Sequence, residues 1–397
     1  MRKWVRRGLW GLGGIVVVIL ALAVIWRQEL MRLNGVLTLF NEDRIVANFS
    51  HMDDAFLSTP VKRGGPVFTF GEAAQSPPET FVGVDGETRV ADYLAQTATT
   101  SLLVVRDDNI EFEAYYLGTK EDDLRISWSI AKSFLSTLLG VAVGEGAIES
   151  LDDPVVKYAP SLKGSAYDGA TVRNVANMAS GVEFDEDYLD FNSDINKMGR
   201  ELALGGSLDA FAARIDGKIA APGDAWKYVS IDTHVLGMAL RGATGRSVAD
   251  YMSDKLWSKI GAEADAYYLT DGHDAAFVLG GLNIRTRDYA KLGRLFLNDG
   301  VWEGERILPA GWARESTAQS APPPYDADHV LGYGYQWWLP PDADDEFFGI
   351  GVYGQYLWVD RKTNVIIVKT SADRNFRANN SQSRLDSIAM FRAISRR

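Results

Sequence analysis

The chain has 397 residues, of which 46% are apolar and 24% charged, and it contains no cysteine. This composition is that of an ordinary globular protein and excludes a disordered chain, a disulfide-stapled scaffold and thiol-based catalysis. The formal net charge is −12, from 41 Lys and Arg against 53 Asp and Glu, so binding to the phosphate backbone of a nucleic acid is not expected.

The first 33 residues differ from the rest of the chain. Residues 8–26 carry no charge, and a helix of that length spans about 28 Å, close to the thickness of the hydrocarbon core of a bilayer. Basic residues precede this run, which keeps the N-terminus in the cytoplasm and exports the remainder. The sequence therefore predicts a membrane anchor over residues 1–33 and a single-pass membrane protein folded on the periplasmic or extracellular face. The alternative is a signal peptide cleaved after Ala21-Leu22-Ala23, followed by secretion.

Residues 34–98 are mixed in character, with loop signals at Arg63–Pro66 and Ser76–Pro78, and we expect an extended lead-in segment that wraps a later core. The next segment predicts a β-hairpin, with strands at 101–106 and 110–117 joined by a polar turn.

A second hairpin is predicted near the C-terminus, with strands at 355–359 and 365–370. Residues 129–300 between the hairpins are mostly helical in pattern, and a last helix covers about 381–395. This order favours an α+β fold, in which both ends of the chain complete one antiparallel sheet flanked by helices, with a mainly helical region inserted between them. The cleft between sheet and helical region is the natural place for a site.

The strongest local signal for chemistry is Ser129-Ile130-Ala131-Lys132, followed by the apolar run 135–143. A spacing of three places Lys132 one helical turn from Ser129 on the same face, where its amine can approach the hydroxyl. Free N–H groups at a helix start favour the oxyanion formed when a serine attacks a carbonyl. Lys132 can act as a base only if its pKa is lowered well below ~10.4. The same spacing also arises by chance, as a helix cap followed by a surface lysine.

The second element is Tyr228-Val229-Ser230, which follows the Pro222-Gly223 turn and precedes an apolar helix. A tyrosine hydroxyl near an ammonium group can relay a proton, which gives Tyr228 a candidate acid-base role. The alternative is a core tyrosine with one hydrogen bond.

The third element is Gly349-Ile350-Gly351, just before the last hairpin. Glycines there let a substrate lie against the strand, and a free N–H can complete an oxyanion hole. An ordinary strand bulge is the alternative.

Taken in this order, the three elements resemble the serine β-lactamase and penicillin-binding-protein superfamily, in particular the class C-like branch that includes esterases and 6-aminohexanoate-dimer (nylon-oligomer) hydrolases. Ser129 to Lys132 match the S-x-x-K motif. Tyr228 to Ser230 stand where the branch has Tyr-x-Asn or Tyr-x-Ser, and Gly349 to Gly351 where it has Lys-Thr-Gly or His-x-Gly. Further matches within residues 98–375 are Leu151–Pro154, Tyr158–Pro160, Asn177–Gly181, Leu279–Leu282 and Gly332–Trp337.

The resemblance implies a β-lactamase-like serine hydrolase domain over residues 99–397 that needs no cofactor and no metal. In such a domain Ser129 attacks the carbonyl of a small amide or ester, Lys132 and Tyr228 share the base and acid roles, and the backbone N–H groups of Ser129 and Val352 hold the oxyanion. The residues expected to contact the substrate are Ser230, Asp232, Gly351, Tyr353 and Trp337.

The sequence also departs from the superfamily pattern. No Lys or His occupies position 349, so the cation with which many β-lactamases hold the substrate carboxylate is missing, and Ser230 with Asp232 favours the nylon-oligomer hydrolase and esterase side. No Gly-x-Ser-x-Gly elbow is present, which disfavours a Ser-His-Asp hydrolase. Two alternatives stay open: a DD-peptidase or β-lactamase of the same fold, and a non-catalytic ligand-binding ectodomain. The expected partners are a small-molecule substrate and, through residues 8–26, a membrane.

Overall fold

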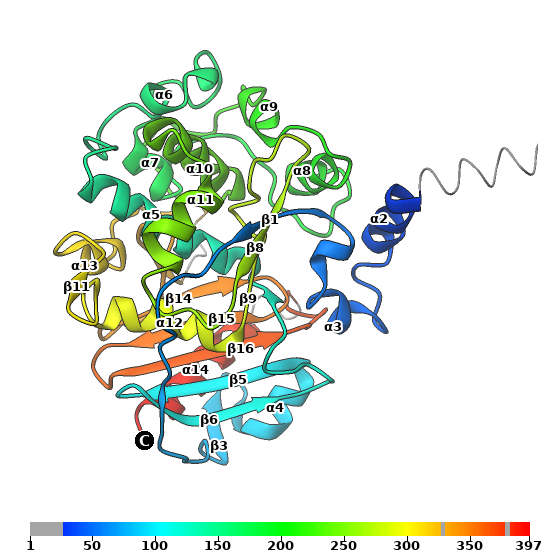
Figure 1. Ribbon diagram of the computed structural model, residues 1–397, viewed down its shortest axis with the longest axis vertical. Coiled ribbons are helices and arrows are strands. Elements are labelled where there is room, and N and C mark those ends of the chain that lie inside the picture. Colours follow the sequence, from blue (N-terminus) through cyan, green and yellow to red (C-terminus); the bar gives the residue numbers. More distant parts are fainter. Residues whose placement is uncertain (1–26, 327–329, 378–381) are drawn as a thin grey trace, which may run out of the picture.

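The computed structural model describes residues 27–326, 330–377 and 382–397. In Figure 1 a large sheet occupies the lower half of the molecule and most of the helices occupy the upper half. The sheet contains, in spatial order, β12 (Gly332–Tyr333), β13 (Trp338–Leu339), β14 (Glu346–Gly351), β15 (Gln355–Asp360), β16 (Val365–Ser371), β5 (Thr99–Arg106), β6 (Asn109–Tyr115) and β2 (Gly71–Glu72).

Both predicted hairpins are present in this sheet, as β5–β6 and β15–β16. The two hairpins meet where β16 pairs antiparallel with β5, from Val365 opposite Arg106 to Ser371 opposite Thr99. Every neighbouring pair in the sheet is antiparallel except the short pairing of β2 with β6, which is parallel. The α+β prediction is therefore confirmed: strands from both ends of the chain complete one sheet.

The sheet contributes side chains to two separate hydrophobic cores, one on each face, because successive residues of a strand point to opposite faces. Leu103 and Val105 pack toward the helical region, whereas Leu102 and Val104 pack on the other face. That second face is covered by α14 (Gln382–Ser395) together with α4 (Val90–Gln96). The predicted last helix is thus confirmed as a cover of the sheet.

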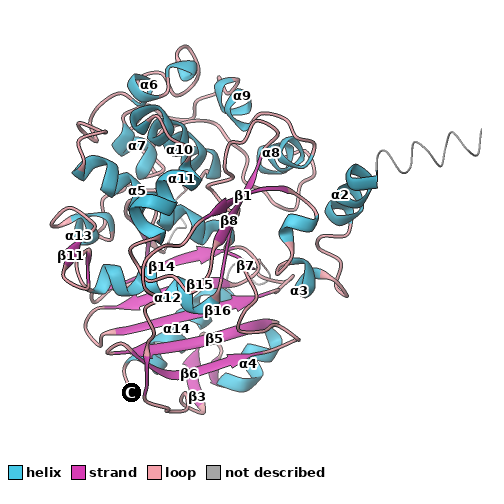
Figure 2. Cartoon of the chain, in the orientation of Figure 1, coloured by secondary structure: helices cyan, strands magenta, loops and turns pink. Residues whose placement is uncertain are grey.

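The inserted region is mainly helical, as Figure 2 shows in cyan. Its helices are α5 (Ala131–Gly144), α6 (Val155–Tyr158), α7 (Val172–Ala176), α8 (Asp194–Ala203), α9 (Leu208–Ala213), α10 (Ser230–Thr244), α11 (Val248–Met252), α12 (Thr286–Leu297) and α13 (Trp312–Ser316). The chain also has three short 3₁₀ helices, η1 (Met52–Asp54), η2 (Trp128–Ile130) and η3 (Pro160–Leu162), within the described residues. One π-helical turn, η4 (Ser253–Trp257), follows α11.

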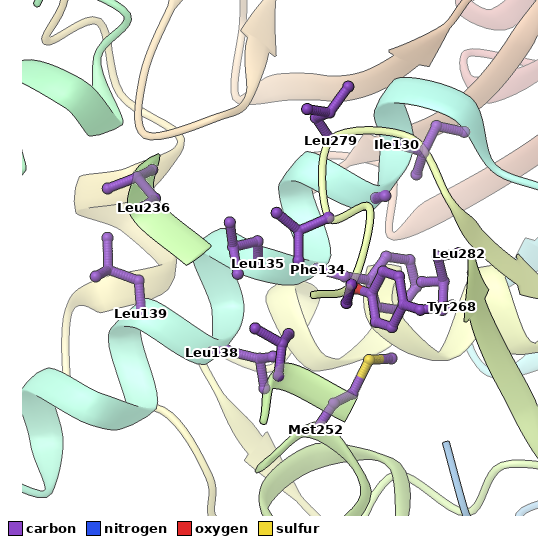
Figure 3. Packing of buried hydrophobic residues seen from close by; sticks show 14 of the residues in the cluster. Ile130, Phe134, Leu135, Leu138, Leu139, Leu236, Met252, Tyr268, Leu279 and Leu282 are labelled. Carbon is purple, nitrogen blue, oxygen red and sulfur yellow. The ribbon is translucent and has the colours of Figure 1, made fainter. Parts of the chain in front are cut away.

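Helix α5 runs through the centre of this region and is apolar on almost all sides. Residues 131–142 are all buried, which explains why the sequence shows a continuous apolar run rather than one apolar stripe. Phe134, Leu138 and Leu139 pack among residues of other elements, including Leu236 of α10 and Met252 of α11 (Figure 3). This packing fixes the helix that carries Lys132.

The predicted lead-in segment, residues 34–98, has regular structure of its own. After α2 (Arg27–Leu37) and α3 (Ile45–Asn48), β1 (Leu57–Val61) pairs with β8 (Ala266–Thr270) of the helical region. A small sheet continues from β8 through β9 (Leu282–Ile284) to β7 (Arg125–Ile126), and two short hairpins are formed by β3 (Thr80–Gly83) with β4 (Gly86–Arg89) and by β10 (Val301–Trp302) with β11 (Glu305–Arg306). Through this strand pairing, β1 lies against the helical region.

The predicted membrane anchor requires a correction. None of the helices within residues 27–326, 330–377 and 382–397 is long and apolar enough to cross a bilayer. The longest, α10, has 15 residues and spans about 22 Å, and the more apolar α5 is buried inside the protein. For this part of the chain the prediction of a single-pass membrane protein with a membrane partner is wrong. Residues 8–26, on which it rested, lie outside the described residues.

Candidate active site

Ser129 lies in η2, a single tight turn that leads from β7 into α5. Trp128, directly before it, has a φ of 45°, a left-handed conformation that is strained for a tryptophan. The end of β14 packs against this turn: a Cβ at Gly351 would lie 2.6 Å from the carbonyl oxygen of Ser127 and 3.0 Å from Cβ of Trp128. Because Gly351 has no side chain, β14 can approach the turn that carries the half-buried Ser129.

Lys132 reaches Ser129 as the spacing predicts. Its Nζ lies 2.9 Å from Oγ of Ser129 and donates a second hydrogen bond of 2.7 Å to the carbonyl oxygen of Leu279. Leu279 belongs to a tight loop in which a Cβ at Gly281 would lie 2.8 Å from the carbonyl oxygen of Phe277. The side chain of Lys132 is 1% exposed, and burial lowers its pKa to about 7, although the charge of Glu186 opposes the shift.

Tyr228 completes the group of predicted catalytic residues. Nζ of Lys132 lies 5.3 Å from the centre of its ring, and the neighbouring Ser129 side chain acts on the pKa of its hydroxyl. Burial, and next the charge of Glu186, raise the pKa of Tyr228 above its ordinary value, so the hydroxyl keeps its proton at neutral pH. Its ring stacks on Trp338, with centroids 5.1 Å apart.

Glu186 is a site residue that the sequence reasoning missed. It lies in the loop between α7 and α8 and accepts hydrogen bonds from the N–H of Ser230 at 2.9 Å, from the hydroxyl of Ser230 and from the hydroxyl of Tyr188 at 2.6 Å. Its charge acts on both Lys132 and Tyr228. The available signal was a cluster of acidic residues, Glu183 and Asp185 to Asp187, which alone is typical of a solvated loop.

Ser129, Tyr228 and Glu186 line a cavity of about 560 Å³ between the sheet and the helical region, and Lys132 is buried beneath Ser129. Of the predicted substrate contacts, Gly351 lines the cavity, as does the neighbouring Val352, whereas Ser230 is buried behind Glu186. Tyr353 packs beside the cavity between Trp128 and Phe40.

The structure places the other two predicted contacts inside the protein. Trp337 is fully buried against Phe296 and Phe347, and its neighbour Trp338 lines the cavity instead. Asp232 is also fully buried and accepts hydrogen bonds from Tyr167 at 2.7 Å and Ser180 at 2.8 Å, while burial raises its pKa to about 7.

No group of three or more His, Asp or Glu side chains within the described ranges is arranged as metal ligands are. The side chains at this site offer a hydroxyl, an amine that is partly neutral near pH 7, and a protonated phenol. These groups at the junction of an antiparallel sheet and a helical region define the class, a serine hydrolase of the β-lactamase and penicillin-binding-protein fold.

Comparison with known proteins gives the family. The chain belongs to the Beta-lactamase family, whose sequence pattern matches residues 87–387. It is 31% identical over 316 residues to a 6-aminohexanoate-dimer hydrolase of Paenarthrobacter ureafaciens, an alignment that covers 75% of this chain and 79% of that protein.

Solved structures agree on the fold. A structure from Bacillus anthracis, assigned by name as a 6-aminohexanoate-dimer hydrolase, superposes with a TM-score of 0.78 at 26% identity and covers 90% of this chain and 95% of that chain. A D-stereospecific amidohydrolase from a Streptomyces species gives a TM-score of 0.58 at 18% identity, over 77% of this chain and 98% of the other, and shows the shared fold alone.

Proposed function

We propose that this protein hydrolyses a small amide or ester through an acyl-enzyme on Ser129, with Lys132 as general base and Tyr228 as general acid. The observation that carries the proposal is the 2.9 Å contact between Nζ of Lys132 and Oγ of Ser129, made by a lysine whose pKa burial lowers to about 7. A serine hydroxyl is a weak nucleophile until an adjacent base takes its proton, and only a neutral amine can do so.

In the first half-reaction the hydroxyl proton of Ser129 passes to neutral Lys132 as Oγ bonds to the carbonyl carbon. The tetrahedral intermediate then expels the amine or alkoxide, which takes the phenolic proton of Tyr228, and the ammonium of Lys132 returns a proton to Tyr228. Water attacks the acyl-enzyme in the second half-reaction, with one proton reaching Oγ as the acid product leaves. The residues end in their starting protonation states.

The oxyanion is assigned to the backbone N–H groups of Ser129 and Val352. Two features support this role: Ser129 lies in η2, the turn that runs directly into α5, and Val352 follows Gly351 at the point where β14 meets this turn. Donors fixed in this way stabilise charge that develops only in the transition state.

The relatives support an amide or ester rather than a β-lactam as substrate. The relative that is 31% identical and the solved structure that is 26% identical are both named as 6-aminohexanoate-dimer hydrolases. At position 349, where many β-lactamases carry a cation, the space in front of the glycine is filled by Ile130 and Ser133, whose atoms would lie 3.3 Å from an added Cβ.

The test is intact-mass spectrometry after exposure to a fluorophosphonate probe. The native protein should gain one adduct that maps to Ser129; Ser129→Ala should gain none, and Lys132→Ala should be labelled at least about 100-fold more slowly. Lys227→Ala is the matched control, because Lys227 also lines the cavity and its amine bonds to the carbonyl oxygen of Phe184. A native protein that stays unlabelled beside a labelled control hydrolase would overturn the proposal.

A further inference from the structure

Two aromatic residues beside the reacting serine have unusual backbone conformations. Trp128 directly precedes Ser129 in η2, the serine turn, and has a φ of 45°; Tyr353 directly follows Val352 and has a φ of 62°. Both values lie in the left-handed region, which is costly for a bulky side chain and persists only where the surrounding structure holds it. Each residue is the neighbour of one backbone N–H group assigned to the oxyanion, so the position of that group depends on the contacts that hold its neighbour.

The lead-in segment supplies such contacts to both residues. The ring of Phe40 stacks on Tyr353, with centroids 5.2 Å apart and 14° between the ring planes, and on Trp128, with centroids 6.2 Å apart. The ring of Phe49 meets the same two rings edge-on, with centroids 5.5 Å from Trp128 and 5.3 Å from Tyr353. These are favourable geometries for aromatic pairs. Phe40 and Phe49 together form an aromatic clamp on the two left-handed residues.

Hydrogen bonds attach the aromatic clamp to β7, the strand that leads into the serine turn. The N–H of Ile126 donates to the carbonyl oxygen of Phe49 at 3.0 Å. The buried guanidinium of Arg125 donates to the carbonyl oxygen of Val46 at 2.6 Å and to the hydroxyl of Ser50 at 2.9 Å. The backbone around Phe49 is therefore fixed relative to the strand that carries the serine turn.

A second connection joins the lead-in segment to the loop that follows β16. Glu42 pairs with Arg374 of this loop at 3.0 Å; both side chains are exposed, so the pair aligns the two segments more than it stabilises them. In the same loop Phe376 packs on Tyr353, with centroids 4.8 Å apart, and lines the cavity. Tyr353 is thus held between Phe40 on one side and a residue of the cavity wall on the other.

We propose that the aromatic clamp, Phe40 and Phe49, positions the two backbone N–H groups that hold the oxyanion. This inference rests on the proposed function, which assigns the oxyanion to the N–H groups of Ser129 and Val352. Both clamp residues are positioning residues, because they act through the neighbours of these groups, and donors stabilise a transition state only when they are fixed in place. The clamp precedes residue 87, where the match to the Beta-lactamase family begins, so the lead-in segment supports the reaction from outside that pattern.

Phe40→Ala tests the proposal without unfolding the protein, because the side chain of Phe40 is 42% exposed. In the hydrolysis of 4-nitrophenyl butyrate this variant should have a kcat at least about fivefold below that of the native protein and a KM within about twofold, because the oxyanion donors act in the transition state. Phe40→Tyr keeps the ring and should restore the native kcat. Leu37→Ala is the matched control: it truncates a side chain of the same segment that is 72% exposed, and it should change neither constant.

Hydrogen exchange followed by mass spectrometry measures the two turns independently of activity. In Phe40→Ala the peptides that contain residues 127–130 and 351–354 should exchange at least about threefold faster than in the native protein, because the contacts that hold these turns are weakened. In Leu37→Ala and Phe40→Tyr the same peptides should exchange at the native rate.

Fluorophosphonate labelling separates failure of this inference from failure of the proposed function. If Ser129 of the native protein is labelled, a Phe40→Ala variant with the native kcat, a Phe40→Tyr variant as slow as Phe40→Ala, or unchanged exchange in both turns would overturn the clamp. If Ser129 is not labelled, the proposed function fails and the exchange rates decide alone. Faster exchange of both turns in Phe40→Ala would then show that the clamp holds them, and native rates would show that it does not.

Discussion

Lys132 owes its proposed chemistry to its surroundings rather than to its identity. An exposed lysine has a pKa of ~10.4 and is almost fully protonated at pH 7. In this protein burial lowers the pKa of Lys132 to about 7, and the negative charge of Glu186 works in the opposite direction by favouring the ammonium form. The fraction of neutral base near pH 7 is therefore a balance between desolvation and one carboxylate.

This balance predicts a pH profile. The reaction needs neutral Lys132, so kcat/KM for a neutral ester should rise with pH, with an inflection near 7, and level off above it. Glu186→Gln removes the charge that raises the pKa of Lys132, and should move the inflection to lower pH. Initial rates of 4-nitrophenyl butyrate hydrolysis between pH 5 and 9 give the profile.

Asp187→Asn is the control for this experiment. Asp187 lines the same cavity next to Glu186, but its charge is paired with Arg377 and does not contribute to the pKa of Lys132. Its substitution should leave the inflection in place. A profile that Glu186→Gln does not move, or that both variants move equally, would show that Glu186 does not tune the base.

At the residue scale, sequence spacing predicted the contact between site residues that are close together in the sequence. It did not predict the site residues that distant segments contribute. Ser129 and Lys132 are three residues apart at a helix start, so their contact follows from helix geometry. Glu186 reaches the site from a loop, through hydrogen bonds to Ser230, and no periodicity indicates that contact. Trp337 and Trp338 are adjacent, so they point in opposite directions, and the sequence alone did not show which of them faces the cavity.

At the scale of elements, the close approach of β14 to the serine turn depends on Gly351. An added Cβ would lie 2.6 Å from a backbone oxygen, that of Ser127, which cannot rotate away as a side chain can. Gly351→Ala should therefore push the strand from the turn and slow fluorophosphonate labelling of Ser129 by at least about tenfold, because the oxyanion donor on the strand is displaced.

Gly349→Ala on the same strand is the matched comparison. Its added Cβ would meet only side-chain atoms of Ile130 and Ser133, at 3.3 Å, so small rotations can accommodate it. Labelling should be affected clearly less than in Gly351→Ala. Similar labelling rates in the two variants, with circular dichroism unchanged in both, would refute the importance of the close approach at Gly351.

The hairpins were predictable because their alternation and turns are local signals, and β5–β6 and β15–β16 match the predicted ranges within a few residues. The pairing of β1 with β8 could not be predicted from the sequence, because it joins Leu57 to Thr270 across more than two hundred positions and leaves no local pattern. The lead-in segment consequently looked extended in the sequence, although it adds a strand to the small sheet.

At the scale of the whole molecule, the sheet joins the two hydrophobic cores. Leu103 and Val368 belong to the core on the helical side, and Leu102 and Ile367 to the core under α14, yet these residues alternate along the same paired strands, β5 and β16. Losing either core exposes one face of the sheet that supports the other. We therefore expect the cores to unfold together despite the length of the chain.

Phe391→Ala tests this coupling from the core under α14. Phe391 of α14 is fully buried, with ring centres 5.3 Å from Tyr356 and 5.7 Å from Trp358, and its truncation should lower the free energy of unfolding by about 3 to 5 kcal/mol. In urea, circular dichroism, tryptophan fluorescence and Ser129 labelling should share one midpoint in the native protein and shift together to lower urea in the variant. Leu117→Ala, at a side chain that is 59% exposed, should leave the midpoint within error. If instead labelling persisted in Phe391→Ala beyond an early fluorescence transition, the core under α14 would unfold separately from the core that holds the site.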